Sequence, residues 1–392
     1  MRDPRRAPGT LGNPVAGALG RSRDEVAAYL ALAQVPGIGS GRLRTLVAAF
    51  ETATAALRAP HGAIAALPGF SRAAASAIRA GSVRAGHEIL DELDRFGAGV
   101  LLPDDAAFPP LLREIAESPA LLFVWGDVSV LVRPAAGIVG SRDHSAYGAD
   151  AARLLASGVA RAGVVVVSGM ARGIDAVAHT AALDAGGASI GVLGNGFGVI
   201  YPAANRTLYD RMRAGGCLVT ELSPGERPHA GAFPRRNRLI SGLAGVTVVV
   251  EAAPGSGALI TTDCALDQGR AVLAVPGPIT SPTSLGCNRL IQQGAKPALT
   301  AGDILEELGM PGAVQASAER PAVGESPAER PPPPDLSGLQ RSLWETLRTE
   351  PKHVDALVAT AGMDTSAVLT ALTELEIRGV VKQQPGMLFG LA

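Results

Sequence analysis

Three arginines lie close together between an aromatic ring and a short apolar run, in a stretch that reads Phe233, Pro234, Arg235, Arg236, Asn237, Arg238 and then Leu239 to Leu243. A guanidinium presents a planar fork of donors that suits phosphate oxygens, and it can also stack on a base. The ring of Phe233 offers a further face for stacking. We interpret this stretch as a loop. Two explanations are open: a phosphate-bearing partner, or a solvated loop whose arginines pair with nearby carboxylates.

Four glycine-containing turns elsewhere suit the same anionic chemistry, because N–H groups at the start of a helix attract anionic oxygens. The first turn adds a hydroxyl and a guanidinium, and the second offers Gly169 and Arg172. In an open α/β sheet the loops that follow the strands meet at one edge. We therefore expect the arginine stretch to share one pocket with these turns, which are Gly140-Ser141-Arg142, Ser168 to Asp175, Gly194 to Gly198, and Ser256-Gly257.

The elements that must position these turns alternate regularly through the middle of the chain. Continuous Val/Ile runs separated by helical segments are typical of a buried parallel sheet covered on both faces. The sequence therefore predicts a Rossmann-like, doubly wound, mostly parallel α/β sheet in a domain of residues 98–310. The predicted strands are Gly137 to Val139, Val164 to Val167, Ser189 to Leu193, Cys217 to Glu221, Val246 to Glu251 and Ala271 to Val275.

The segment before this sheet, residues 24–97, predicts an all-α domain of the helix-hairpin-helix (SAM-like) kind. Val35-Pro36-Gly37-Ile38-Gly39 and Leu67-Pro68-Gly69-Phe70-Ser71 lie 32 residues apart, and each precedes a helical run. Such turns expose backbone N–H groups that suit a phosphate oxygen. They also serve in protein contacts, so the sequence leaves both roles open.

The ends of the chain differ in composition from its middle. Residues 1–23 read as a disordered basic N-terminus, and residues 311–335 read as a Pro-rich linker that cannot bury enough apolar surface to fold. Residues 336–392 have the pattern of a winged-helix domain. Its expected recognition helix, Thr365 to Arg378, carries Glu374 and Glu376, which favours protein contact or autoregulation over DNA reading.

Composition limits the class of protein. The 392 residues hold 35 Lys+Arg and 36 Asp+Glu, so a nucleic acid would have to be met by a local basic patch rather than by a global field. No apolar run approaches the length of a membrane span, and no signal peptide is apparent, so we expect a cytoplasmic protein that does not contact a membrane. The three cysteines and six histidines have no metal or disulfide spacing. We predict no cofactor and no metal.

The order of the turns resembles one known family. GIVGSR, SGMARGID, GVLGNGFGVIYP, FPRRNRLISGL, VVVEAAPGSGALIT, AVPGP and LGCNRLI are similar to the motifs of the DNA-processing protein A family, DprA (also called Smf), from about Leu121 to Leu308. The resemblance implies a homodimeric, non-catalytic protein of natural transformation that protects incoming single-stranded DNA and helps to load the RecA recombinase. It places Ser141, Arg142, Arg235, Asn237 and Arg238 in the strand-binding pocket. Gly140, Gly169, Arg172, Arg236 and the ring of Phe233 complete our predicted DNA-binding set.

Two enzymatic readings compete with DNA binding. A nucleotide or nucleoside-phosphate hydrolase of a related Rossmann-like fold could use Asp175, Glu221, Glu251 or Asp263 as acid or base, although each carboxylate also suits a helix cap or an arginine partner. A dinucleotide-dependent oxidoreductase fits less well. The first strand is followed by Gly-Ser-Arg, where a Gly-x-Gly-x-x-Gly turn would be needed.

Overall fold

The computed structural model describes residues 21–310, 333, 335–348, 352–384 and 386–391. The chain divides into two compact units, Met1–Ala318 and Glu319–Ala392. Most of the predicted basic N-terminus (1–23) and of the predicted linker (311–335) lies outside the described residues. These two predictions therefore stay predictions, and the two units are described separately below.

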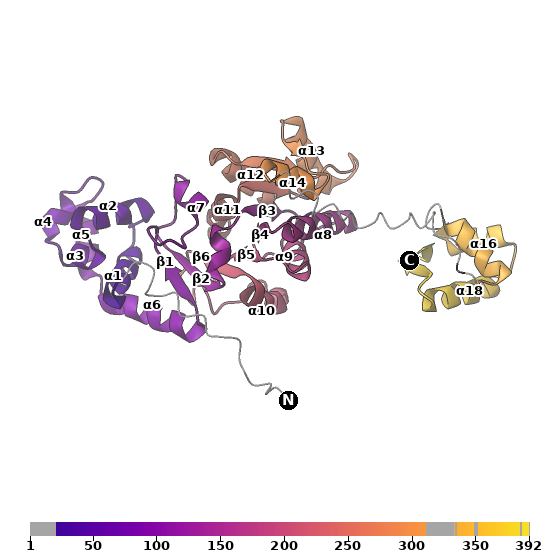
Figure 1. The fold of residues 1–392 in the computed structure, drawn as a ribbon, viewed down its shortest axis with the longest axis horizontal. Helices are drawn as coiled ribbons and strands as arrows, with labels where there is room; N and C mark the ends of the chain where they lie inside the picture. Colours follow the sequence, from indigo (N-terminus) through magenta and orange to yellow (C-terminus); the bar gives the residue numbers. More distant parts are fainter. Residues whose placement is uncertain (1–20, 311–332, 334, 349–351, 385, 392) are drawn as a thin grey trace, which may run out of the picture. The chain divides into compact units, whose positions relative to one another are not determined.

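The first unit is built on a nine-stranded, mostly parallel sheet (Figure 1). Its order is β1-β2-β6-β5-β4-β3-β7-β8-β9, and only β1 and β2 run antiparallel to their neighbours. The predicted doubly wound fold is confirmed. The strands are β1 (Gly99–Leu101), β2 (Leu122–Gly126), β3 (Ala135–Val139), β4 (Val165–Ser168), β5 (Ser189–Val192), β6 (Cys217–Thr220), β7 (Val246–Val249), β8 (Ala271–Ala274) and β9 (Lys296–Pro297).

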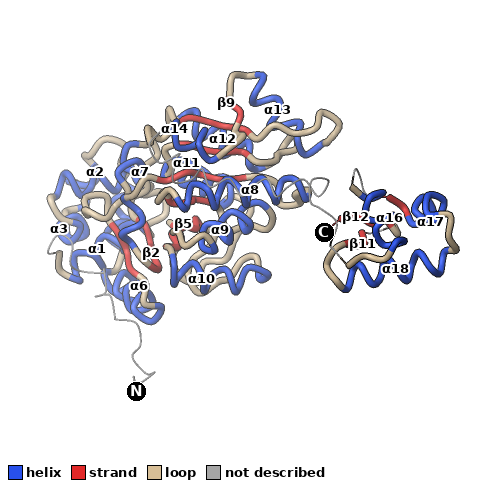
Figure 2. The backbone as a smooth tube through the Cα atoms, turned by 45° about the vertical axis from the view of Figure 1, so that its right-hand side comes forward, coloured by secondary structure: helices blue, strands red, loops and turns tan. Residues whose placement is uncertain are grey.

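Helices cover both faces of this sheet, so its central strands are buried on each side (Figure 2). One face packs against α8 (Ala146–Arg161), α9 (Ile174–Asp184) and α14 (Ala301–Glu307) through small and branched side chains. The other face packs against α7 (Pro110–Glu114), α11 (Ala232–Leu243), α12 (Gly257–Asp267) and α13 (Leu285–Gln292). Burial on both faces explains why the strands read as unbroken apolar runs rather than as alternating ones.

The helical segment before the sheet contains both predicted hairpins. Its helices are α1 (Arg23–Ala33), α2 (Ser40–Phe50), α3 (Ala53–Arg58), α4 (His61–Ala65), α5 (Arg72–Ala80) and α6 (Val83–Phe96). Gly37 and Gly69 both have φ +81°, a backbone conformation that glycine adopts without steric cost. Each turn closes with the same bond, from Ile38 N to Val35 O at 3.0 Å and from Phe70 N to Leu67 O at 3.1 Å. The second hairpin therefore forms although Ser71 replaces glycine.

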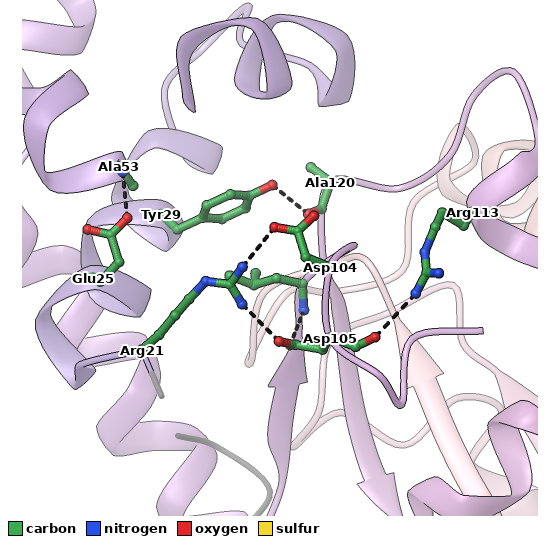
Figure 3. A network of polar contacts seen from close by, with 9 residues as sticks. Arg21, Glu25, Tyr29, Ala53, Asp104, Asp105, Arg113 and Ala120 are labelled. Atoms are coloured by element: carbon green, nitrogen blue, oxygen red, sulfur yellow. Dashed lines mark hydrogen bonds and ion pairs between the residues drawn. The ribbon is translucent and has the colours of Figure 1, made fainter. Parts of the chain in front are cut away.

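A polar network and a shared core join this helical segment to the sheet (Figure 3). The Arg21 guanidinium donates to Asp104 and Asp105, both at 2.8 Å, and the Tyr29 hydroxyl donates to the Ala120 carbonyl at 2.9 Å. The apolar core of α1 to α6 continues through Phe123 of β2 to the helix α10 (Arg206–Gly215). The helical segment and the sheet therefore pack as one compact unit, and a domain boundary at residue 97 stays a prediction.

The second unit has the predicted winged-helix pattern. It contains α16 (Gly338–Leu347), β10 (Lys352–His353), α17 (Val354–Ala361), α18 (Thr365–Ile377), β11 (Val381–Gln384) and β12 (Leu388–Leu391). β12 pairs with both other strands, so a short third strand joins the expected hairpin. Within the described residues no single helix could span a membrane; α17 and α18 meet the length and composition criteria only as a pair bent by 112°.

Candidate nucleic-acid interface

The predicted turns meet at the carboxyl edge of the parallel strands. A cavity of about 150 Å³ lies between the turns that follow β4 and β5 and the start of α11. The turn after β3 contributes Arg142 to the same cavity. The residues that line it are Arg142, Gly169, Met170, Ala171, Arg172, Leu193, Gly194, Asn195, Tyr201, Pro202, Phe233 and Arg236.

A larger cavity of about 520 Å³ lies beside the first, between the loops that follow β3 and β7. The chain leaves β3 toward β4 on one side and leaves β7 toward β8 on the other, so this position is the topological switch point of the sheet. Gly140 and Ser141 line it, together with Asn237 and the residues from Pro254 to Ala258. The two cavities adjoin, because Arg142, Ala171, Phe233 and Arg236 line both.

The arginine stretch is a helix, and the prediction of a loop was wrong. Residues Ala232–Leu243 form α11, with Pro234 in the first turn, where a missing N–H is tolerated. Leu239, Ile240 and Leu243 face the core and hold the helix against the sheet. The helical geometry separates the arginines: Arg235 is exposed, Arg236 is buried, and Arg238 points to a carboxylate away from both cavities.

Arg236 lies at the bottom of both cavities and is only 7% exposed. Its Nη1 donates to the carbonyls of Gly169 and Val192, and its Nε donates to the Asn237 side-chain oxygen at 3.3 Å. A Cβ at Gly169 would lie within 2.7 Å of the guanidinium carbon, so the close approach requires glycine there. Glycine at position 169 therefore allows the Arg236 guanidinium to pack against the turn.

Asp175 is the carboxylate that compensates the buried charge of Arg236. It accepts hydrogen bonds from the amides of Gly169 at 3.1 Å and Ala171 at 3.3 Å, and so fixes the turn after β4. Burial raises the pKa of Asp175, while the positive charge of Arg236 opposes the rise. Burial likewise lowers the pKa of Arg236, and the negative charge of Asp175 opposes that change. The charges of the pair offset each other, so the positive charge that would favour an anion comes from Arg142 and Arg172 at the opening.

Aromatic faces and a second guanidinium surround the mouth of the smaller cavity. The ring centroids of Phe233 and Tyr201 lie 5.7 Å apart, and the Arg142 guanidinium carbon lies 5.6 Å from the Phe233 centroid. Tyr201 is 44% exposed and Arg142 is exposed. Phe233 also lies against Gly194, where an added Cβ would come within 3.0 Å of the ring. Flat faces and a charge are thus available together at one opening.

The turns after β3 and β4 hold each other in place. Ile174 N donates to the Ser141 carbonyl at 3.1 Å, and a Cβ at Gly173 would lie 2.3 Å from that carbonyl oxygen. The Ser141 hydroxyl is used locally, because it donates to the Asp143 carbonyl at 2.9 Å and accepts from the Asp143 amide. The Arg172 guanidinium is 61% exposed beside the smaller cavity and has only a 3.8 Å ion pair with Asp143. It can therefore turn toward a bound anion at little cost.

Two predicted residues lie elsewhere than expected. Arg238 is 12% exposed and pairs with Glu221 at 2.5 Å, and it lines neither cavity. Arg235 is exposed on the first turn of α11 and also lines neither cavity, and no described carboxylate pairs with it. The expected direct role of Arg238 in the pocket is therefore not supported by its position, because its charge is already compensated by Glu221.

The sequence reasoning placed Met170 in the second turn but missed that Asn205 bonds to this turn. Met170 has φ +56°, and the Asn205 amide donates to the carbonyls of Met170 and Ala171 at 2.9 and 3.1 Å. These bonds fix the turn that forms one wall of the smaller cavity. Met170 belongs to the predicted turn, but no local pattern links Asn205 to it, because Asn205 reaches the turn from a point 34 residues further along the chain.

The carboxylates considered for hydrolysis are largely engaged in structure. Glu251 is 1% exposed and accepts from the Ser145 amide and hydroxyl at 2.9 and 2.5 Å and from the Thr283 hydroxyl at 3.1 Å. It lines neither cavity, and Glu221 is the partner of Arg238. Asp263 is exposed on α12 and also lies outside both cavities. Only Asp175 reaches the larger cavity, where it orders backbone amides.

Comparisons with known proteins agree with this architecture. Residues 99–309 match the family described as DNA recombination-mediator protein A, and residues 327–387 match the DprA winged helix domain. Protein Smf of Escherichia coli (strain K12) is 41% identical over 288 residues, which cover 73% of this chain and 76% of the relative.

Two solved structures extend the comparison. The X-ray structure of DNA processing protein A (DprA) from Streptococcus pneumoniae has a TM-score of 0.64 and 34% identity, over 73% of this chain and 98% of that chain. DNA processing protein A from Helicobacter pylori, whose structure was described for its single-stranded DNA binding mode, has a TM-score of 0.50 and 26% identity, over 54% of this chain and 96% of that chain. This chain belongs to the DNA recombination-mediator protein A (DprA/Smf) family.

Proposed function

We propose that this protein binds single-stranded DNA across the two adjoining cavities at the carboxyl edge of its sheet. The observation that carries the proposal is the Arg142, Phe233 and Tyr201 group at the cavity mouth above the buried Arg236. Proteins that hold single strands combine cationic side chains along the backbone with aromatic faces for the bases, and such stacking contributes roughly 1–3 kcal/mol per base. Single-stranded DNA binding by the Helicobacter pylori relative supports the proposal.

Each predicted site residue then has a role that fits its position. Arg142 and Arg172 neutralise phosphates at the opening, and Phe233 stacks on a base, with Tyr201 beside it. Gly140 and Ser141 bring a close backbone surface to the strand, whereas Gly169 makes room for Arg236 and its amide donates to Asp175. Arg235 reaches the backbone of the strand from the exposed start of α11. Arg236, Asn237 and Arg238 position the others, because their polar atoms bond within the protein.

The site is suited to binding rather than to turnover. A hydrolase needs a carboxylate or another base that faces the substrate, and most candidates here bond to backbone amides, hydroxyls or arginines. We therefore propose a non-catalytic mediator that acts in the cytoplasm as a homodimer during DNA uptake. It would protect incoming strands and pass them to the RecA recombinase.

A titration of labelled single-stranded oligonucleotides tests this function. We expect the intact protein to bind a thymidine oligomer at low salt, and the Arg142→Ala/Phe233→Ala variant to lose at least about tenfold in affinity, because it lacks one phosphate contact and one stacking face. Arg153→Ala is the matched control, since Arg153 is exposed on α8 and pairs only with Asp150. Unchanged affinity in the double variant, or no binding by the intact protein, would overturn the assignment.

A further inference from the structure

The helices α2 to α5 carry a concentration of positive charge that the single-strand site does not use. Between Ser40 and Ala80 the chain has one carboxylate, Glu51, and five arginines, so this segment has a formal charge of 5 − 1 = +4 in a protein of net charge −1. The five are Arg42, Arg44, Arg58, Arg72 and Arg79. The helices that carry them form the end of the first unit most distant from α13 (Figure 1).

These arginines are exposed and lack acidic partners. All five side chains belong to exposed residues, and no carboxylate of the described residues forms an ion pair with any of them. Arg42, Arg44 and Arg79 donate only to backbone carbonyls, those of Gly37, Ser118 and Arg58, which orient the guanidiniums without neutralising them. Some exposed arginines elsewhere in this unit do have carboxylate partners, for example Arg84 with Glu88 and Arg153 with Asp150.

The first hairpin also has open space above the start of α2. A Cβ at Gly39 or at Gly41 would meet nothing within 4 Å, and Gly39 has an ordinary φ of −79°. Gly39 is the N-cap of α2, a position where glycine is favoured over alanine. Neither packing nor backbone geometry requires Gly41, although glycine in a helix costs about 0.5–1 kcal/mol relative to alanine. No side chain caps α2, so its first amides face the open space. A partner that approaches the backbone closely would explain Gly41.

The surface of α2 to α5 lacks exposed apolar and phenyl side chains, and this absence indicates the kind of partner that it binds. No large apolar side chain is exposed between residues 40 and 80, whereas a lipid surface or the core of a protein interface would use such side chains. Phe70 is buried and Phe50 is half-buried, and the exposed imidazole of His61 is held by contacts with the Arg72 carbonyl and the Ser76 hydroxyl, so no exposed phenyl ring is available for unstacked bases. Charge without stacking faces suits a nucleic acid whose bases are already paired.

We infer that α2 to α5 form a second nucleic-acid surface, which binds the phosphate backbone of duplex DNA independently of the single-strand site. The two hairpins present the same turn twice, but only α2 starts without a side-chain cap, since the Ser71 hydroxyl accepts from the Ala74 amide at the start of α5. The start of α2 can meet phosphates through backbone amides, and the second hairpin can meet them through its arginines. Contact to the backbone alone carries no sequence preference, and it gives a strong dependence on salt. The protein could thus hold a single strand and a duplex at the same time.

Fluorescence titration of the full chain with a blunt DNA duplex and with a thymidine oligomer tests this inference. Arg58→Glu/Arg72→Glu removes no side-chain bond of the described structure, and we expect it to weaken duplex binding by at least about tenfold while single-strand binding stays unchanged. Arg153→Glu/Arg161→Glu on α8 makes the same change of net charge away from this surface, and should leave duplex binding near that of the intact protein.

Gly41 provides a second, independent variant. Gly41→Ala leaves every charge in place, adds a methyl group in open space, and should lower duplex affinity without lowering the melting temperature. If the intact chain does not bind duplex at low salt, or if Arg58→Glu/Arg72→Glu binds duplex as well as the control variant does, the inference is overturned. Loss of single-strand binding in Arg142→Ala/Phe233→Ala tests the other site alone.

Discussion

The edge of the sheet and the helices α2 to α5 both present exposed arginines, but only the sheet edge also has buried ones. At the sheet edge Arg236 and Arg238 are largely buried and bonded, and two aromatic rings lie beside the opening. On α2 to α5 the arginines are exposed without carboxylate partners among the described residues, and no phenyl ring is exposed. Buried arginine builds a shaped pocket that can accept unstacked bases, whereas exposed arginine provides charge for a backbone. The same residue type therefore supports two different modes of binding.

The largest expected effect is on the free energy of unfolding, and it tests whether Arg236 stabilises the fold at the sheet edge. Arg236→Met would leave the carbonyls of Gly169 and Val192 without a donor and Asp175 without its countercharge. We expect the free energy of unfolding in a denaturant titration to fall by about 3–5 kcal/mol. Arg235→Ala, one residue away and exposed, should change it by no more than about 0.5 kcal/mol. Equal effects would show that burial does not distinguish these arginines.

The pH dependence of stability should show the same buried framework. His179 is fully buried beside Ser189, and burial together with the nearby Arg236 lowers its pKa to about 3. Its unfolded pKa near 6.5 is higher, so the unfolded chain binds the proton more readily. Stability is therefore complete above about pH 6.5 and decreases toward pH 3, by about 2 kcal/mol between pH 7 and pH 5.

The raised pKa of Asp175 acts in the opposite direction, since the folded state takes up that proton more readily as the pH falls. The informative quantity is therefore the difference between the intact protein and His179→Phe. Denaturant titrations at several pH values should give a flatter curve for His179→Phe. Identical slopes would contradict the assignment of a neutral buried imidazole.

The salt dependence of DNA affinity distinguishes the single-strand site from the duplex surface on α2 to α5. Loss of Arg142 and Arg172 should reduce the slope of log affinity against log salt for a single strand by about 1.4, since each phosphate contact on single strands contributes about 0.7. The same double alanine variant should leave the duplex slope unchanged. A common change in both slopes would mean that one surface binds both forms of DNA.

The smallest expected effect concerns the packing of the Phe233 ring against Gly194. Gly194→Ala would place a methyl group about 3.0 Å from the ring and displace it by a few tenths of an ångström. We expect a loss of a few fold in single-strand affinity, with little change in the melting temperature. Gly163→Ala would be a poor control because Gly163 has φ +82°, whereas Gly338, at the start of α16, lines neither cavity and has open space and an ordinary backbone. Gly338→Ala should bind as the intact protein does.

Local sequence signals were sufficient for most of the framework. The unbroken Val165, Val166 and Val167 run and the glycine turns that follow each strand predicted the sheet and the edge at which the turns meet. The α11 helix was missed, because Pro234 and a cluster of charged residues resemble a loop and only Leu239, Ile240 and Leu243 form its apolar face.

The bonding partners of each arginine could not be predicted from the sequence alone. Arg236 is satisfied by the carbonyls of Gly169 and Val192, which lie 67 and 44 residues away in sequence. Arg238 is compensated by Glu221 from a different strand end. Such partners depend on how the strands are ordered in the sheet, and no local pattern encodes that order. Likewise, the open space beside Gly39 and Gly41 is evident only from the structure.

Photocrosslinking of a single strand is the most direct test of the pocket. A thymidine oligomer that carries 5-iodouracil would be bound to the intact protein, irradiated, and the crosslinked peptides identified by mass spectrometry. Because the account places bases against Phe233 and Tyr201, it predicts crosslinks to peptides that contain one or both of these rings. Crosslinks confined to other parts of the chain, with none at either ring, would contradict it.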